Sequence, residues 1–202
     1  SALYDANGEL ISETQTEKKA EYVEYEDIPA YFVTAMVSIE DKKFYKHNGI
    51  DYKAIFRAAK AIIQDGTISQ GGSTITMQLA RTIYLDTNKT WQRKVKEMFI
   101  ATELEKRYSK NQIMEFYLNN ICFANGYYGI QAASKGYFDC DISELDLSQV
   151  AFLCTIPNSP TYYDPLVNSD HTITRRNRIL LNMYEDGKIS EKMYNEAVNE
   201  QI

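Results

Sequence analysis

The sequence is poor in the residues that cross-link small proteins or hold metals. It has three cysteines and two histidines among 202 residues. Cys122, Cys140 and Cys154 form no CxxC pair and have no histidine at the spacing of metal ligands, which argues against both a zinc site and a full disulfide framework. We therefore expect these cysteines to be buried thiols.

The sequence also lacks a long apolar run and an excess of positive charge. No stretch of about 18 apolar residues occurs, so we expect no segment that spans a bilayer. The formal net charge of -6 argues against broad nucleic-acid binding, because proteins that bind duplexes along their phosphates carry a basic stripe. The basic residues of this chain are therefore expected to act locally.

No linker rich in Pro, Gly or Ser, no internal repeat and no low-complexity tract divides the chain. Hydrophobic residues make up 44% of the sequence and charges of both signs are interspersed, as is typical of a folded globular protein that can enclose one sizeable core. We expect a single domain over residues 1–202. The chain has no secretory signal and begins and ends abruptly, so we expect it to be part of a longer protein.

The fold is predicted to be mainly α after a short β element. Asn7 and Gly8 stand between short apolar stretches, which is the strongest local signal for a tight hairpin. Pro29, Asp51 and Ser109 suit helix starts before segments with helical apolar spacing. The same periodicity predicts further helices at about 129–138, 147–155, 172–185 and 191–200.

Another long helix is predicted from Thr90, as a cap, through Arg107. Apolar or small side chains recur along it at helical spacing, and we expect them to form its buried stripe. They are Val95, Met98, Phe99, Thr102 and Leu104.

The most informative polar segment is residues 39–49, which reads IEDKKFYKHNG. Adjacent side chains on a helix diverge by about 100°, so Glu40 and Asp41 cannot share a proton as a dyad. One of them can face a cleft while the other makes a structural contact. In isolation, a solvated acidic end of a helix, answered by Lys42 and Lys43, is the commoner interpretation.

Two more polar segments adjoin predicted helices. Residues 71–78, GGSTITMQ, offer a flexible backbone, hydroxyls and exposed amides at a helix start, which suits an anion or a sugar hydroxyl. A glycine loop with an N-cap serine explains the same pattern. Residues 93–97, RKVKE, place Arg93 and Lys94 one turn from Glu97; on a surface such pairs contribute about 0.3–0.5 kcal/mol.

Together with KNQIMEFYLN at residues 110–119 and RRNRIL at residues 175–180, these segments resemble the signature of the peptidoglycan glycosyltransferases. This family comprises the lysozyme-like domain of class A penicillin-binding proteins and their monofunctional relatives. The resemblance covers about 31–184. It implies a lysozyme-like fold with a larger helical head lobe and a small hydrophobic jaw lobe. The jaw would lie at about 67–92 and contact the membrane, and about 1–28 would form the N-terminal hairpin and linker.

The family's Glu-Asp-x-x-Phe-x-x-His-x-Gly motif is matched by Glu40, Asp41, Phe44, His47 and Gly49. The resemblance implies that Glu40 is the catalytic glutamate and that the other four residues support it. We expect His47 to be structural and hydrogen-bonded to its loop, because the family's chemistry relies on carboxylates.

The motif Gly-x-Ser-Thr-Ile-Thr-Gln-Gln is matched except at Met77, where a first glutamine is common, and this departure affects only a polar contact there. The resemblance makes Glu97 the second essential glutamate. We also expect Arg57 to be able to pair with a catalytic carboxylate, and residues 115–119 and 175–178 to brace the helices. The residues implied to bind substrate or its diphosphate are Arg57, Ser73, Thr74, Gln78, Arg81, Lys89 and Lys94.

The resemblance implies a polymerase of cell-wall glycan at the outer face of the bacterial cytoplasmic membrane. Its partners would be lipid II, the growing strand and the membrane surface. Glu40 would act as general base on the 4-hydroxyl of lipid II, which attacks the lipid-linked strand, inverts the anomeric centre to a β-1,4 link and releases undecaprenyl diphosphate. Mg²⁺ or another divalent cation is the candidate cofactor, and no organic cofactor is expected. The sequence does not distinguish a chain in which a transpeptidase domain follows from one in which none does.

Two alternatives stand beside this interpretation. A lysozyme-like hydrolase or lytic transglycosylase also uses a glutamate in an α-rich fold, but as an acid. From another class, a non-catalytic helical module could dock on a membrane or a partner through the apolar segment 68–91.

Overall fold

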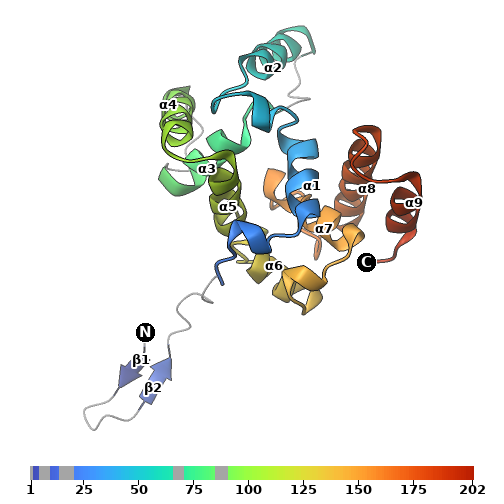
Figure 1. The fold of residues 1–202 in the computed structure, drawn as a ribbon. Coiled ribbons are helices and arrows are strands. Elements are labelled where there is room, and N and C mark those ends of the chain that lie inside the picture. Colours follow the sequence, from blue (N-terminus) through green and yellow to red (C-terminus); the bar gives the residue numbers. More distant parts are fainter. Residues whose placement is uncertain (1, 5–9, 14–20, 66–70, 85–90) are drawn as a thin grey trace.

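The computed structural model describes residues 2–4, 10–13, 21–65, 71–84 and 91–202. Strands β1 (Ala2–Tyr4) and β2 (Leu10–Glu13) pair antiparallel, with Leu3 opposite Ser12. This agrees with the predicted hairpin, whose turn at Asn7 and Gly8 lies outside the described residues. The remaining described chain is helical and connecting segments, which confirms the mainly α prediction (Figure 1).

Most helices start near the predicted positions. The longer ones are α1 (Ala30–Glu40), α2 (Tyr52–Asp65), α3 (Ile75–Tyr84), α4 (Trp91–Arg107), α5 (Lys110–Asn120), α6 (Ile130–Phe138), α7 (Leu147–Leu153), α8 (Ser169–Glu185) and α9 (Glu191–Asn199). The 3₁₀ turns η1 (Tyr25–Asp27), η2 (Phe44–Lys46), η3 (Ile142–Glu144) and η4 (Ile156–Asn158) lie between them.

The caps explain several of these starts. The Asp51 side chain accepts hydrogen bonds from the backbone N–H groups of Lys53 and Ala54, both at 3.0 Å, at the start of α2. Ser109 and Gln112 form a reciprocal capping box at the start of α5. These side chains satisfy backbone donors that the first helical turn leaves free, so the predictions made for Asp51 and Ser109 are confirmed.

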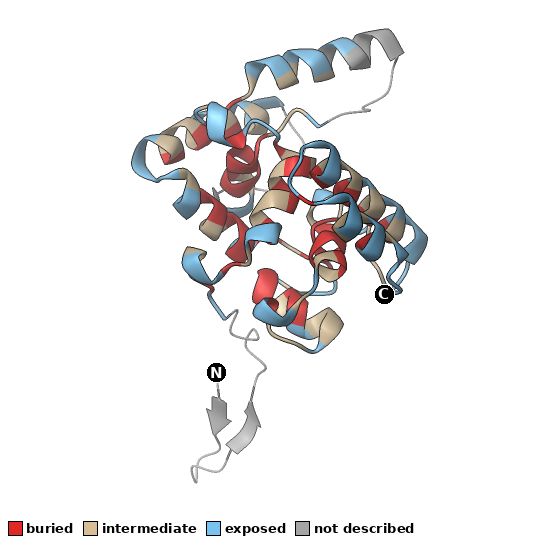
Figure 2. Cartoon of the chain, turned by 45° about the vertical axis from the view of Figure 1, so that its right-hand side comes forward, coloured by how far each residue is buried: buried red, intermediate tan, exposed pale blue. Residues whose placement is uncertain are grey.

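The core lies where α1, α5, α7 and α8 meet, and Figure 2 shows buried residues concentrated along these central helices. α3 packs against α4 and α5, while α1 packs against α7 and α8. The apolar side chains Ile75, Met77 and Leu79 of α3 are fully buried. This part of the segment expected to be a jaw is therefore ordinary core, because α3 is enclosed by two neighbouring helices.

The buried face of α4 differs from the predicted stripe. Val95 and Phe99 are 55% and 67% exposed, whereas Glu97, Ala101 and Leu104 are buried. The buried set follows the i, i+4, i+7 pattern of one face, and the predicted set, correct only for Leu104, is otherwise centred about 140° away. The helix turns a charged residue inward because that residue meets cations there, as described below.

α2 stands at the edge of the molecule, with one end away from the helical body (Figures 1 and 2). Its Tyr52 and Phe56 are exposed. Its beginning packs on the glycine segment before α3, since a Cβ atom on Gly72 would lie 3.3 Å from the Cβ of Ala58. Within the described ranges, no helix is long and apolar enough to cross a bilayer.

The segments expected to brace the fold do so at both ends of the helical body. Asn119 accepts a 2.9 Å hydrogen bond from the N–H of Val23 and donates one of 2.8 Å to its carbonyl. Glu115 accepts from the N–H of Tyr25 at 2.9 Å. Arg176, on α8, is buried and donates to the carbonyl groups of Val198 and Glu200. Cys154 is also a buried free thiol, and Cys122 and Cys140 are free and partly buried.

Candidate active site

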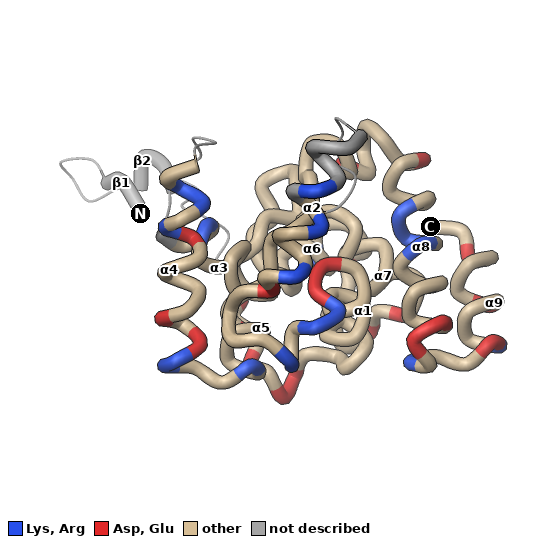
Figure 3. The backbone as a smooth tube through the Cα atoms, turned by 90° about the horizontal axis from the view of Figure 1, so that it is seen from above, with Lys and Arg blue, Asp and Glu red and all other residues tan. Residues whose placement is uncertain are grey.

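A cleft of about 940 Å³ opens between the end of α1, the start of α2, the segment before α3, and α8. Glu40 lies in it together with most of the residues predicted to bind substrate. Its polar lining includes Glu40, Arg57, Ser73, Thr74, Gln78, Arg81, Asn158, Arg175 and Arg178. Seen from above, Lys and Arg occur on α2, α4 and α8 around this part of the molecule (Figure 3).

Hydrogen-bond donors occupy both carboxylate oxygens of Glu40. Arg175 Nη2 lies 2.7 Å from Oε1, and Gln78 Nε2 lies 3.0 Å from Oε2. Asn158 Nδ2 lies 3.2 Å from Oε1 and 3.4 Å from Oε2. The Glu40 side chain is only 5% exposed. The carboxylate is thus fixed in one orientation, because one charged and two neutral donors face it.

Asp41, the residue after the end of α1, also lines the cleft, but its carboxylate makes structural contacts. It accepts a 2.8 Å hydrogen bond from His47 Nε2 through Oδ2, and the same oxygen accepts from the backbone N–H of Ile75 at 3.1 Å. His47 Nδ1 accepts from the N–H of Gly49 at 3.1 Å, so Nε2 carries the proton. Asp41 therefore joins the η2 loop to the first turn of α3, and the expected hydrogen bonding of His47 to its loop is confirmed.

Gly49 and Thr74 complete this internal connection. Gly49 has φ +88° and a Cβ atom there would lie 2.8 Å from the carbonyl oxygen of Ala101. The Thr74 hydroxyl donates to the Gly49 carbonyl at 2.6 Å and accepts from the N–H of Met77 at 3.1 Å. Phe44 is fully buried, with Lys110 Nζ 4.5 Å from its ring centre. These residues support the cleft wall from within.

Glu97 is the centre of a group of three cations. Lys94 Nζ lies 2.8 Å from Oε2, Arg93 Nε lies 3.3 Å from Oε1, and Arg81 Nη1 lies 3.9 Å from Oε1. Lys94 also donates to the hydroxyl of Ser73. Glu97 is 0% exposed and does not line the cleft, whereas Arg81 and Ser73 do. Glu97 therefore holds basic side chains at the edge of the cleft. Because Glu97 is buried, its ion pairs differ from ordinary pairs on a surface.

The predicted partner of the catalytic carboxylate was wrong. Arg57 lines the cleft and is exposed, but Arg175 is the arginine that contacts Glu40. Arg175 and Arg176 share a motif that is expected to brace the helices, although side chains at adjacent helix positions point about 100° apart. This angle between neighbouring helix positions is the signal that separates the roles of Arg175 and Arg176. Asn158 belongs to no recognisable motif, so the sequence does not predict its contact with Glu40. Lys89 lies outside the described residues.

The departure at Met77 has a simple structural consequence. The Met77 side chain is fully buried in α3, one residue before Gln78. It contributes packing where a glutamine would bring a polar group. Of these two neighbouring residues, Gln78 is the one that contacts Glu40.

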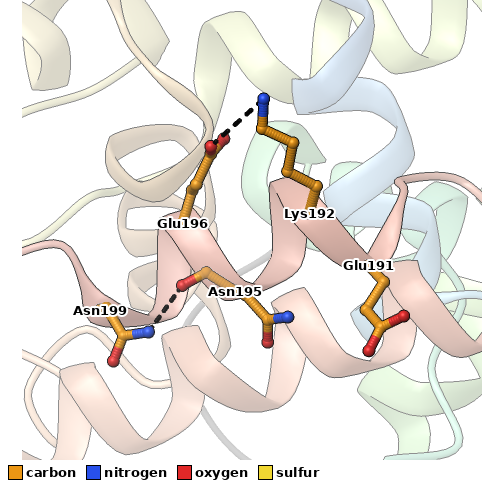
Figure 4. A pocket seen from close by; sticks show the side chains of 5 residues that line it. All are labelled: Glu191, Lys192, Asn195, Glu196 and Asn199. Carbon is orange, nitrogen blue, oxygen red and sulfur yellow. Dashed lines mark hydrogen bonds and ion pairs between the residues drawn. The ribbon is translucent and has the colours of Figure 1, made fainter.

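A second, shallower hollow of about 600 Å³ lies on α9 (Figure 4). Its lining comes from one face of a single helix, where Lys192 and Glu196 form a 3.8 Å ion pair and Asn199 donates to the carbonyl of Asn195 at 2.8 Å. These are interactions between successive turns of an exposed helix. The hollow brings together no groups from different elements and is not a candidate site.

The main cleft combines the features that suit group transfer on an anionic substrate. One nearly buried carboxylate faces it, and basic side chains stand at its edge. The chain belongs to the Transglycosylase family, whose model matches residues 7–184. It is a transglycosylase domain of the kind found in class A penicillin-binding proteins, which confirms the family that its motifs resemble.

Similar proteins include Penicillin-binding protein 4 of Bacillus subtilis (strain 168), 39% identical over all of this chain and 32% of the relative. Penicillin-binding protein 1A of Aquifex aeolicus is 41% identical over all of this chain and 28% of the relative. The chain thus spans about a third or less of these relatives. A crystal structure of Penicillin-Binding Protein 1A from Haemophilus influenzae matches with a TM-score of 0.55 and 21% identity, over 100% of this chain and 20% of that one, which shows the shared fold.

Proposed function

We propose that this domain polymerises lipid II into β-1,4-linked glycan strands at the outer face of the cytoplasmic membrane. The observation that supports it most directly is the nearly buried Glu40 carboxylate beside a cationic cleft edge. The 4-hydroxyl of lipid II attacks the anomeric carbon of the lipid-linked strand. Its proton passes to Glu40, and the electron pair of the breaking C–O bond leaves with undecaprenyl diphosphate.

Glu40 needs one free oxygen lone pair to accept that proton. In the structure, Arg175 makes the closest contact to the carboxylate. The Nε of Arg175 is buried without a hydrogen-bond partner, and the guanidinium lies over the Tyr163 ring at 4.9 Å. A diphosphate or sugar oxygen that binds Arg175 would weaken its hold on Oε1. Substrate binding would thereby make Glu40 a stronger base when the acceptor hydroxyl arrives.

Diphosphate is already a competent leaving group, so charge neutralisation matters more than proton donation to it. We assign this role to Arg81 and Lys94, whose side chains are 39% and 38% exposed. Both contact Glu97, which fixes them in place without entering the cleft. Glu97 is then a positioning residue, and the cations it orders stabilise the charge that develops on the diphosphate.

The carboxylates of Glu40 and Glu97 do not form a ligand set that fits a resident Mg²⁺ ion. Cations surround Glu97, and Arg175, Gln78 and Asn158 occupy the oxygens of Glu40. Across the described ranges, no group of three acidic, histidine or cysteine side chains could hold a metal. A divalent cation that arrives bound to the substrate diphosphate stays a prediction, which assays with and without Mg²⁺ test.

The experiment is polymerisation of labelled lipid II by the wild-type domain and by Glu40→Gln. Loss of a general base lowers rates by about 10²–10⁴, and Gln keeps the side-chain volume. Glu103→Gln is the matched control, because Glu103 pairs only with the exposed Lys106 on α4. Near wild-type turnover by Glu40→Gln would contradict the assignment. Release of fragments from polymeric cell wall, without polymerisation, would identify the hydrolase instead.

The proposed membrane contact extends beyond the predicted jaw segment and includes one exposed face of α4. Trp91, Val95 and Phe99 are exposed on one face of α4, at i, i+4 and i+8, and Ile83 of α3 is also exposed. Lys96 stands within the same stretch. An apolar stripe with a tryptophan and basic neighbours suits the interface of an anionic membrane.

A further inference from the structure

Tyr117 lies outside the cleft but connects to the proposed base. It is fully buried in α5 and contributes nothing to the cleft lining. Its hydroxyl lies 3.0 Å from Gln78 Oε1, and Gln78 Nε2 lies 3.0 Å from Glu40 Oε2. An unbroken path of two hydrogen bonds therefore runs from the core through Gln78 to the carboxylate.

The direction of both hydrogen bonds follows from the chemistry of the groups. An ionised carboxylate only accepts, so Gln78 must present its NH₂ group to Glu40. Its Oε1 then faces Tyr117, which must donate. Burial, with the nearby Glu40 charge adding to it, raises the pKa of the Tyr117 hydroxyl well above its ordinary value, so the phenol keeps the proton it donates.

We propose that Tyr117 is a positioning residue for Glu40. By donating to Gln78 Oε1, the Tyr117 hydroxyl prevents the Gln78 amide from turning that oxygen toward the Glu40 carboxylate. The two successive hydrogen bonds then fix Glu40 Oε2 in place. This inference rests on the proposed role of Glu40.

Other charged or titratable groups lie near Glu40. Arg175 from α8 pairs with it at 2.7 Å, Arg81 from α3 lines the same cleft, and the buried thiol of Cys154 after α7 interacts with it electrostatically. Burial raises the pKa of the Cys154 thiol. None of them contacts Gln78 in the hydrogen bonds described above, so removal of the Tyr117 hydroxyl perturbs one oxygen of Glu40 selectively.

The first test is Tyr117→Phe in lipid II polymerisation. Loss of one neutral hydrogen bond predicts a fall in kcat of about 2- to 10-fold. KM should change little, because Tyr117 does not touch substrate.

Tyr137→Phe is the matched control. Its hydroxyl donates at 2.7 Å to the carbonyl of Phe123, in a part-buried place outside the cleft. The Tyr137 hydroxyl also accepts from Asn125 Nδ2 at 2.9 Å, so both variants lose tyrosine hydrogen bonding, but only Tyr117→Phe should lower kcat. An unchanged kcat in Tyr117→Phe, or an equal fall in both variants, would overturn the inference.

A double-mutant cycle tests the path through Gln78. If Tyr117 acts only through that amide, Tyr117→Phe should have no further effect on kcat in a Gln78→Ala background. Fully additive effects would show that Tyr117 acts by another route and would overturn the inference.

A measurement without substrate separates failure of this inference from failure of the proposed function. The side-chain NH₂ signals of Gln78 are identified in ¹⁵N-edited NMR spectra by their loss in Gln78→Ala. They should exchange faster with water in Tyr117→Phe than in the wild type, because the amide is released. Unchanged exchange refutes the relay even if the domain polymerises lipid II, whereas absent polymerisation with faster exchange refutes only the function.

Discussion

Replacement of Glu97 by glutamine is the sharpest test of how the cationic edge of the cleft is built. Glu97 is 0% exposed and contacts three basic side chains, of which Lys94 is the closest at 2.8 Å. Glutamine keeps the volume but removes the charge and turns an NH₂ group toward a cation. Breaking a buried ion pair costs about 3–5 kcal/mol. We expect the lower end, about 3 kcal/mol, because Lys94 and Arg81 are partly exposed and can regain water.

For a domain of about 200 residues, that loss corresponds to a fall in Tm of about 6–12 °C. The measurement is urea unfolding followed by circular dichroism, with Glu103→Gln as control. Glu103 makes an exposed i, i+3 pair with Lys106 on the same helix, and such a solvent-screened pair contributes little to stability. Equal destabilisation by the two substitutions would refute the view that Glu97 is a buried anchor.

Two further predictions concern the backbone turn and the exposed stripe of α4. Gly49→Ala should destabilise the domain by about 1–3 kcal/mol in urea unfolding, and by more than Gly126→Ala, because both glycines have positive φ but only Gly49 would bring a Cβ against a neighbouring carbonyl; equal effects would exclude the clash as the cause. Combined Trp91→Ser and Phe99→Ser should weaken sedimentation with phosphatidylglycerol vesicles by 10-fold or more, at about 1.5–3 kcal/mol for each buried side chain, whereas Leu166→Ser, which alters an exposed apolar residue elsewhere, should not. Unchanged vesicle binding would place the membrane contact on another surface.

Local features of this fold could be predicted from the sequence because their causes are local. The caps at Asp51 and Ser109 each satisfy amides within three residues. Glu40 and Asp41 make separate contacts, as expected for adjacent carboxylates that cannot act as a dyad, and Asp41 serves as the C-cap of α1. The family motifs then indicated which of the two carboxylates faces the cleft, which spacing alone leaves open.

Features that depend on distant partners were missed or misassigned. The contact between Arg175 and Glu40 joins positions 135 residues apart, and no periodicity within either helix encodes it. α4 buries Glu97 in place of Val95 and Phe99, because three basic side chains meet the glutamate. A hydrophobic pattern assumes that the apolar face is the buried one, and here electrostatic pairing selects the other face.

The neighbouring arginines of α8 also determine where this domain can be cut. Arg176 is 3% exposed, and the carbonyl groups of Val198 and Glu200 are two of its acceptors. A truncation before Val198 would leave a buried guanidinium short of acceptors, at about 1–3 kcal/mol or more. Because Arg175 directly precedes Arg176 on α8 and pairs with Glu40, the disturbance would lie beside the Glu40 carboxylate. A fragment trimmed there for crystallisation or screening would report on a disturbed cleft.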